Sequence, residues 1–245
     1  VFVAVLLAIV VSTSSAVLSW VQGPARILVA TLVGLAFAYT LLLTRPRLRG
    51  PFYRAFVAIP ALGFTAGCVL VSPWAVASAL GATPHGWWLA YALAAVGVMQ
   101  SLHAPRETFS IDLDGADAGP LAPSRHRPTR GPDTKPLRIV QITDPHIGPF
   151  MSVQRLRAIC ERAAAQDPDL VLITGDLLTM ASHGNSKAVA FAFEPLEALP
   201  GRVFACYGNH DNEARATVDD GLRGIARILV DEAVQVQTAV GAIEI

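Results

Sequence analysis

Acidic residues are absent from the first 105 residues of this 245-residue chain, where five arginines are the only charged side chains. All 19 acidic residues lie from Arg106 onward and outnumber the basic residues there, so the formal net charge of zero describes neither part. A nucleic-acid-binding surface needs clustered lysine and arginine, and the acidic second part therefore argues against nucleic acid as a partner. A carboxylate-rich cation site fits this part better.

Cysteine is also scarce. The three cysteines, Cys68, Cys160 and Cys206, lie far apart and without C-x-x-C spacing, which argues against a disulfide framework or a zinc knuckle. We interpret all three as small buried hydrophobic residues. The chain opens on Val1 and its last four residues resemble an interrupted strand, so we expect a fragment of a longer protein at both ends.

Long hydrophobic runs occupy the first part of the chain. Residues 27–44 and 55–72 are each 18 residues without a charge, near the length of roughly 20 residues that an apolar helix needs to cross a bilayer. Residues 1–21 form a third run and residues 87–102 a shorter fourth. Buried helices of a soluble protein would carry polar faces at helical spacing, which these runs lack. Residues 1–105 are therefore predicted to be a four-helix transmembrane region with the lipid bilayer as its partner.

The arginines also predict an orientation. Residues 45–54 carry four arginines, whereas the next loop, residues 73–86, carries none. Loops rich in arginine stay in the cytoplasm, and four crossings return the chain to that side. We therefore expect a multi-pass protein of the cell (inner) membrane with a cytoplasmic catalytic domain. The four tryptophans fall at the opposite span ends, as in an interfacial aromatic belt: Trp20, Trp74, Trp87 and Trp88.

The remaining residues divide into a linker and a domain. Residues 106–136 are rich in proline, glycine and aspartate and are predicted to be a linker, with a possible edge strand over residues 108–113. Residues 137–245 alternate strands with helices, which implies parallel βαβ units whose functional loops gather at the carboxyl ends of the strands. Strands are expected over residues 137–142, 169–173, 202–207 and 234–237, and helices from Ser152, over residues 186–199 and up to Leu229.

Polar motifs follow the first three expected strands. They are Asp144-Pro145-His146, Gly175-Asp176 and Gly208-Asn209-His210-Asp211. Asp, His and Asn supply the oxygen and nitrogen ligands that suit divalent Mn, Fe or Zn. The two glycines allow the tight or positive-φ backbone that turns the next side chain toward a metal, and the Asp-Pro step is expected to hold Asp144 extended. The three motifs in this order predict one metal site.

These motifs resemble the first three motifs of the calcineurin-like metallophosphoesterases. The resemblance covers residues 137–245, and bacterial members with a similar membrane anchor include phosphodiesterases and UDP-2,3-diacylglucosamine pyrophosphatases. It implies an incomplete α/β domain with the βαβ units of a two-sheet sandwich and helices outside. It also implies two divalent metal ions, the first held by Asp144 and His146, the second by Asn209, with Asp176 bridging both. His210 would stabilise the transition state or protonate the leaving oxygen.

Two cations about 3.5–4 Å apart lower the pKa of a shared water and neutralise charge on the phosphoryl oxygens during in-line attack. Asp211 is expected to orient His210 or its loop, or to cap a turn. Residues 177–179 stand where many relatives carry a second Asp. The family's further ligands, a lone His and a Gly-His-x-His, are expected beyond Ile245. His183 is interpreted as solvent-exposed or near the site entrance and not as a ligand.

The leading functional hypothesis is metal-dependent hydrolysis of phosphate esters or pyrophosphates at the cytoplasmic face of the membrane. Because the spans would keep the site near lipid, a lipid-linked pyrophosphate or other lipid-linked substrate is attractive. The alternative is a membrane sensor or scaffold whose phosphoesterase domain is catalytically inactive, against which the intact motifs argue. A transporter would need polar or charged pathway residues inside its spans, and these runs carry essentially none.

Overall fold

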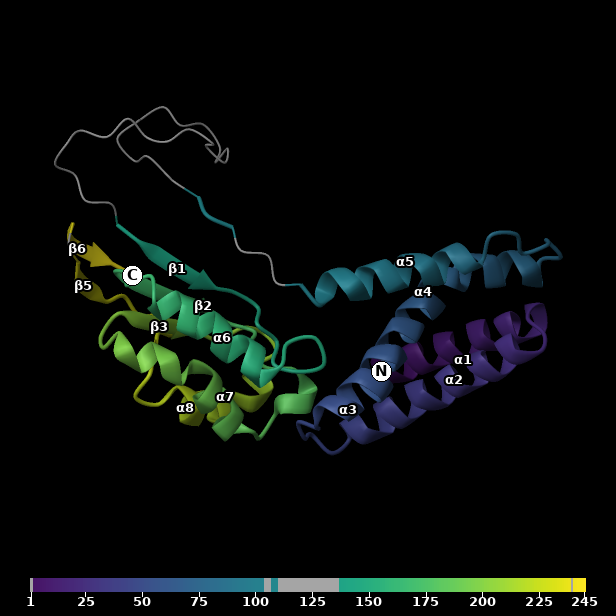
Figure 1. The fold of residues 1–245 in the computed structure, drawn as a ribbon, viewed down its shortest axis with the longest axis horizontal. Coiled ribbons are helices and arrows are strands. Elements are labelled where there is room, and N and C mark those ends of the chain that lie inside the picture. Colours follow the sequence, from purple (N-terminus) through teal and green to yellow (C-terminus); the bar gives the residue numbers. More distant parts are fainter. Residues whose placement is uncertain (1, 104–106, 110–136, 239) are drawn as a thin grey trace, which may run out of the picture.

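The computed structural model describes residues 2–103, 107–109, 137–238 and 240–245. Figure 1 shows a helical part, residues 2–101, beside a part with both helices and strands, residues 139–244. Most of the expected linker, and with it most of the possible edge strand over residues 108–113, lies outside the described residues.

Apolar helices build the first part. They are α1 (Phe2–Trp20), α2 (Pro24–Leu43), α4 (Ile59–Ala79) and α5 (Trp88–Ser101), with the short α3 (Pro51–Tyr53) and a π-helical turn (Arg54–Ala58) directly before α4. Three stretches are long and apolar enough to cross a membrane: Val3–Trp20, Pro24–Leu43 and Pro51–Ala79. The fourth expected span, α5, has 14 residues and is shorter than the roughly 20 residues of a full crossing.

The third stretch is longer than the sequence indicated. Helix continues through Pro73 to Ala79, where we had expected a loop to begin. A proline removes one backbone N–H and tends to kink a helix, but neighbouring helices make it tolerable in apolar surroundings. At about 1.5 Å per residue, this 29-residue stretch is about 44 Å long, which exceeds the roughly 30 Å of a bilayer's hydrocarbon core.

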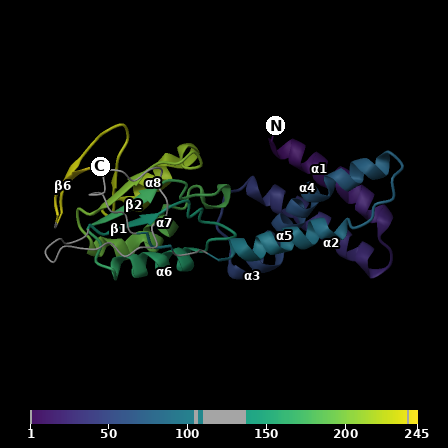
Figure 2. The same ribbon diagram turned by 90° about the horizontal axis from the view of Figure 1, so that it is seen from above.

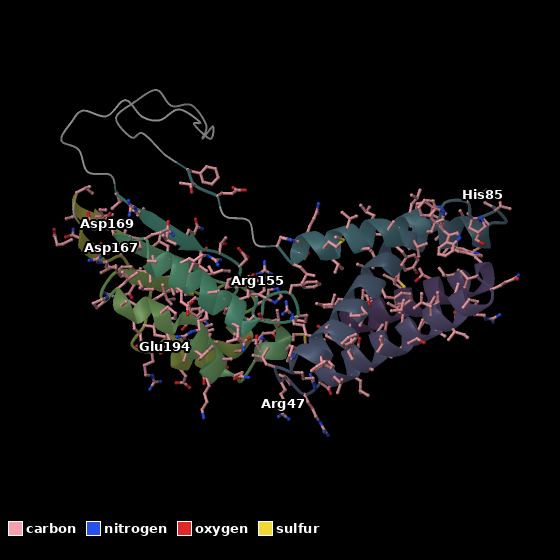
Figure 3. All side chains as sticks on the ribbon, in the orientation of Figure 1. Arg47, His85, Arg155, Asp167, Asp169 and Glu194 are labelled. Carbon is pink, nitrogen blue, oxygen red and sulfur yellow. The ribbon has the colours of Figure 1, made fainter. Side chains whose placement is uncertain are left out.

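The two ends of the helical part differ in chemistry. Trp74 lies within α4, and its indole N–H donates to the carbonyl oxygen of His85 at 2.7 Å. His85 lies at the end far from the sheet (Figure 3). At the opposite end, the Arg54 guanidinium donates to the carbonyl oxygen of Phe150 at 3.3 Å. The arginine-bearing end of the helices therefore contacts the α/β part.

The α/β part contains a parallel sheet in the order β1 (Ile139–Ile142), β2 (Leu170–Thr174), β3 (Val203–Cys206) and β4 (Arg227–Ile228). The crossover helices α6 (Val153–Ala164), α7 (Ser186–Phe193) and α8 (Arg215–Leu222) pack in a row, α6 on α7 and α7 on α8. Right-handed crossovers between consecutive neighbouring strands place all helices on one face. The predicted βαβ arrangement is confirmed, and a second sheet stacked on the first is not found among the described residues.

Helix α6 shows how the sequence builds the core under the sheet. The Ser152 hydroxyl accepts a hydrogen bond from the backbone N–H of Arg155 at 3.2 Å, which caps the helix as predicted. Leu156, Cys160 and Ala163 share the buried face, and burial raises the pKa of the Cys160 thiol to about 12. Cys206, in contrast, is exposed at the end of β3 on a sheet face without helices, so its predicted burial is wrong.

The fourth strand also lies earlier than predicted. Helix α8 ends at Leu222 instead of reaching Leu229, and the next two-residue strand, β4, pairs with β3. Gly224 has a φ of 80°, a conformation that glycine adopts readily and that stops a helix. The strand predicted over residues 234–237 exists as β5 (Gln235–Thr238), but it pairs antiparallel with β6 (Gly241–Glu244) instead of joining the parallel sheet.

Candidate metal centre

Three predicted ligands meet at one edge of the sheet. Asp144 and His146 follow β1, and Asp176 follows β2, its parallel neighbour. One ligand atom of each residue lies within 4.8 Å of the others, and His146 Nε2 is 3.7 Å from Asp176 Oδ2. The carboxyl ends of parallel strands share a sheet edge, which explains why residues 32 positions apart come together. Two carboxylates and an imidazole form a donor set that suits a divalent metal.

The backbone at this edge is left-handed. Asp144, His146 and Asp176 have φ values of 47°, 44° and 51°, which non-glycine residues rarely adopt. The expectation of an extended Asp144 before Pro145 is therefore wrong. Hydrogen bonds between the two loops offset the strain of about 1–3 kcal/mol per residue, because the N–H of His146 donates to the carbonyl oxygen of Asp176 at 3.0 Å. The turns direct both motifs toward each other.

Two glycines permit the close approach of the second and third motifs. Gly175 has the predicted positive φ, and a Cβ there would lie 2.4 Å from the backbone nitrogen of Gly208. A Cβ on Gly208 would lie 2.0 Å from Asp176 Oδ1. Both distances are too short for any real side chain. The Gly-Asp and Gly-Asn-His-Asp motifs therefore form one packed unit.

The two histidines stand side by side at the site. His146 Nδ1 is 3.3 Å from the carbonyl oxygen of Leu178, an acceptor that suits a protonated Nδ1 and an Nε2 lone pair open to a metal. The ring centroid of His210 is 5.1 Å from that of His146. The backbone N–H of His210 donates to Asp176 Oδ1 at 3.0 Å, so the third motif is held by the carboxylate of the second.

Asn209 and Thr143 complete the polar edge. Asn209 is exposed beside His210, and no hydrogen bond within the described part of the chain holds its side-chain amide. The Thr143 hydroxyl donates to the Asp144 carboxylate, a contact that sequence reasoning missed. A hydroxyl directly before the Asp of the first motif is the signal that could have indicated it.

Asp211 connects the second and third motifs. Its carboxylate is fully buried, with 0% exposure, and it accepts hydrogen bonds from three backbone N–H groups. The donors are Leu177 at 3.2 Å, Leu178 at 3.1 Å and Gly208 at 3.0 Å. Its bonds to described groups thus hold the loop of the third motif and do not reach the His210 ring. Leu177 and Leu178 are themselves fully buried.

Replacing Asp211 by alanine should lower the free energy of unfolding by about 2–4 kcal/mol, because three buried N–H groups lose a charged acceptor. Asp211→Asn keeps one acceptor oxygen and should lose less. The exposed neighbour Glu213, replaced by alanine, is the control and should change stability by about 0.5 kcal/mol or less. Denaturant unfolding in detergent measures all three, and a loss below about 1 kcal/mol in Asp211→Ala would contradict this role.

His183 differs from its predicted environment. Its Nε2 atom is buried without a hydrogen-bond partner in the described structure, and the residue as a whole is half-buried, where the sequence predicted that it is solvent-exposed or near the site entrance. It lies outside the group formed by Asp144, His146 and Asp176.

The part of the chain that contains the three motifs is similar to known proteins. The model of the calcineurin-like phosphoesterase family matches residues 137–233, which contain all three motifs. A probable cyclic nucleotide phosphodiesterase of Moraxella catarrhalis is 42% identical over 79 residues, 31% of this chain and 27% of that protein. The UDP-2,3-diacylglucosamine pyrophosphatase LpxG of Chlamydia muridarum is 36% identical over 75 residues, 31% of this chain and 22% of that protein.

A third relative, the phosphodiesterase YaeI of Escherichia coli, is 33% identical over 77 residues, 31% of this chain and 28% of that protein. No solved structure matches the chain. Residues 137–233 are thus similar to the calcineurin-like metallophosphoesterases. The chain matches about a quarter of the length of these relatives.

Proposed function

We propose that this protein is a metal-dependent hydrolase of phosphate esters or pyrophosphates. The observation that carries the proposal is the convergence of Asp144, His146 and Asp176 within 4.8 Å at the edge where the family motifs lie. The relatives are named as phosphodiesterases and as a pyrophosphatase, which supports the same reaction class.

Each residue of the candidate site has a separate role in this proposal. Asp144 and His146 would hold one divalent ion of the Mn, Fe or Zn type, Asn209 a second, and Asp176 would bridge both. Bound cations would supply charge neutralisation for phosphoryl oxygens and a reactive water at neutral pH. His210 lies beside these ligands with its backbone N–H fixed on Asp176, so its ring can donate a proton to the leaving oxygen. Asp211 keeps this loop in place.

The full-length protein, purified in detergent with Mn²⁺, should hydrolyse bis(p-nitrophenyl) phosphate. A chelator should abolish this activity and added Mn²⁺ should restore it, because the bound cations would supply the reactive water and neutralise the phosphoryl oxygens. Glu213→Ala, which changes an exposed carboxylate outside the ligand group, is the control. Metal binding without hydrolysis would favour the inactive sensor or scaffold, and activity that survives chelation would contradict the metal centre.

We also propose that the helical part crosses the cell (inner) membrane and that the metal centre faces the cytoplasm. The arginine-bearing end of the helices contacts the α/β part through Arg54, which supports a common side for both. In a Cys206→Ser background, a membrane-impermeant thiol reagent applied to intact cells should label Ala82→Cys and spare both Arg47→Cys and Lys187→Cys. Labelling of Lys187→Cys from outside would reverse the orientation.

A further inference from the structure

A cavity of about 580 Å³ lies between the metal residues and the end of the helical part. Asp144 and His146 line it from the sheet, and Ser101 and His103 line it from the end of α5. Its volume is within the range of about 300–1,000 Å³ found for small-molecule sites. Figure 3 shows Arg155, another lining residue, at the junction of the two parts. One cavity thus reaches from the catalytic edge to an apolar helix.

The wall beside the metal residues is apolar. Pro145, Pro149, Phe150 and Met151 line it, all from the loop between β1 and α6. A small polar phosphoester would gain little from such a wall. An alkyl chain that packs against this wall would be removed from contact with water, and each fully buried methylene group strengthens binding by about fourfold.

Arginines from both parts hold this wall. The Arg54 guanidinium, from the turn before α4, donates to the carbonyl oxygens of Pro149 and Phe150. Arg155 donates to the same Phe150 oxygen at 3.1 Å. Neither arginine forms an ion pair with a carboxylate of the described chain. Arg155 lines the cavity and Arg54 lies behind its wall, and these two positive charges favour an anionic group close to the apolar wall.

We propose that the cavity binds the alkyl portion of an amphiphilic, lipid-linked phosphoester and presents its phosphate to the metal residues. The inference rests on the proposed function and names the substrate class of that site. The phosphate meets the edge formed by Asp144 and His146 while Arg155 faces its remaining charge. The chain lies along the wall formed by Phe150 and Met151 and leaves toward α5, so the membrane helices supply part of the substrate site.

A series of p-nitrophenyl alkyl phosphodiesters, from methyl to octyl, tests this in the full-length protein with Mn²⁺ and one detergent. We expect kcat/KM to rise by about two- to fourfold per methylene over several methylenes and then to level off. Met151→Glu should flatten this slope, because a carboxylate in the wall repels both the alkyl chain and the phosphate. Met151→Leu should preserve it.

The matched control is Val240→Glu, which adds the same charge at an exposed position at the turn of the β5–β6 ribbon. Figure 2 shows this ribbon at the end of the molecule away from the helical part, and the slope should be that of the wild type. If the wild-type enzyme is active but its kcat/KM does not rise with alkyl length, the inference is overturned and the proposed hydrolase function stands. The same conclusion follows if kcat/KM rises equally with alkyl length in wild type and Met151→Glu, because the rise would then reflect partition into detergent. Hydrolysis of no member of the series would overturn the proposed function itself.

Discussion

Asp176→Ala is expected to lose bound metal and to reduce hydrolysis by at least about 10³-fold, because a bridging carboxylate contributes several kcal/mol through the cations it holds. Asp176 is only 8% exposed, and its two carboxylate oxygens make different contacts. Oδ2 faces His146 Nε2 at 3.7 Å, whereas Oδ1 accepts the His210 N–H at 3.0 Å. Metal content by mass spectrometry and kcat/KM on a phosphodiester measure the effect.

Asp176→Asn separates ligation from loop positioning. An amide oxygen can still accept the N–H of His210, but the side chain loses the negative charge that attracts two cations. The asparagine variant should therefore keep most of the stability that alanine loses while it still loses metal. Wild-type metal content in Asp176→Asn would show that this residue positions the loop and does not bridge.

His210→Ala is expected to lower kcat by about 10²–10⁴-fold with metal content retained, the range for loss of a positioned proton donor. This variant should leave the loop in place, because the backbone N–H of His210 donates to Asp176 and alanine keeps that donor. Only the ring, with its centroid 5.1 Å from that of His146, is removed.

His183→Ala is the matched control for His210→Ala. Its ring lies outside the ligand group, so its loss should affect stability at most and leave metal content and kcat near those of the wild type. Metal loss in His210→Ala equal to that in Asp176→Ala would instead make His210 a ligand. Wild-type activity in both His210→Ala and Asp176→Ala would remove the case for a metallophosphoesterase.

The meeting of the motifs at one sheet edge could be predicted from the sequence because the motifs are local and follow strong strand signals. Short apolar runs indicated β1, β2 and β3, and parallel strands bring their carboxyl ends together whatever the details of the helices. The position of Asp144 beside Asp176 follows from that topology alone. The cap at Ser152 was equally readable, because a hydroxyl before an amphipathic helix is a local signal.

Features that depend on distant contacts were not predictable in this way. Asp144 adopts a positive φ against the preference imposed by Pro145, because the neighbouring loop stabilises the turn. The two-residue strand β4 is too short to show a period, and pairing with β3 alone defines it. The contact of Arg54 with the loop before α6 joins residues 95 or more positions apart, and a positive charge in the sequence did not reveal its partner.

The most direct test of the metal centre is anomalous diffraction from crystals of the full-length protein grown with Mn²⁺. The account predicts an anomalous peak within about 2.5 Å of a carboxylate oxygen of Asp144, of Nε2 of His146 and of Oδ2 of Asp176. A second peak should lie beside Asn209 and share Asp176. Saturating Mn²⁺ with no peak among these residues, or with its strongest peak elsewhere in the molecule, would contradict the central claim.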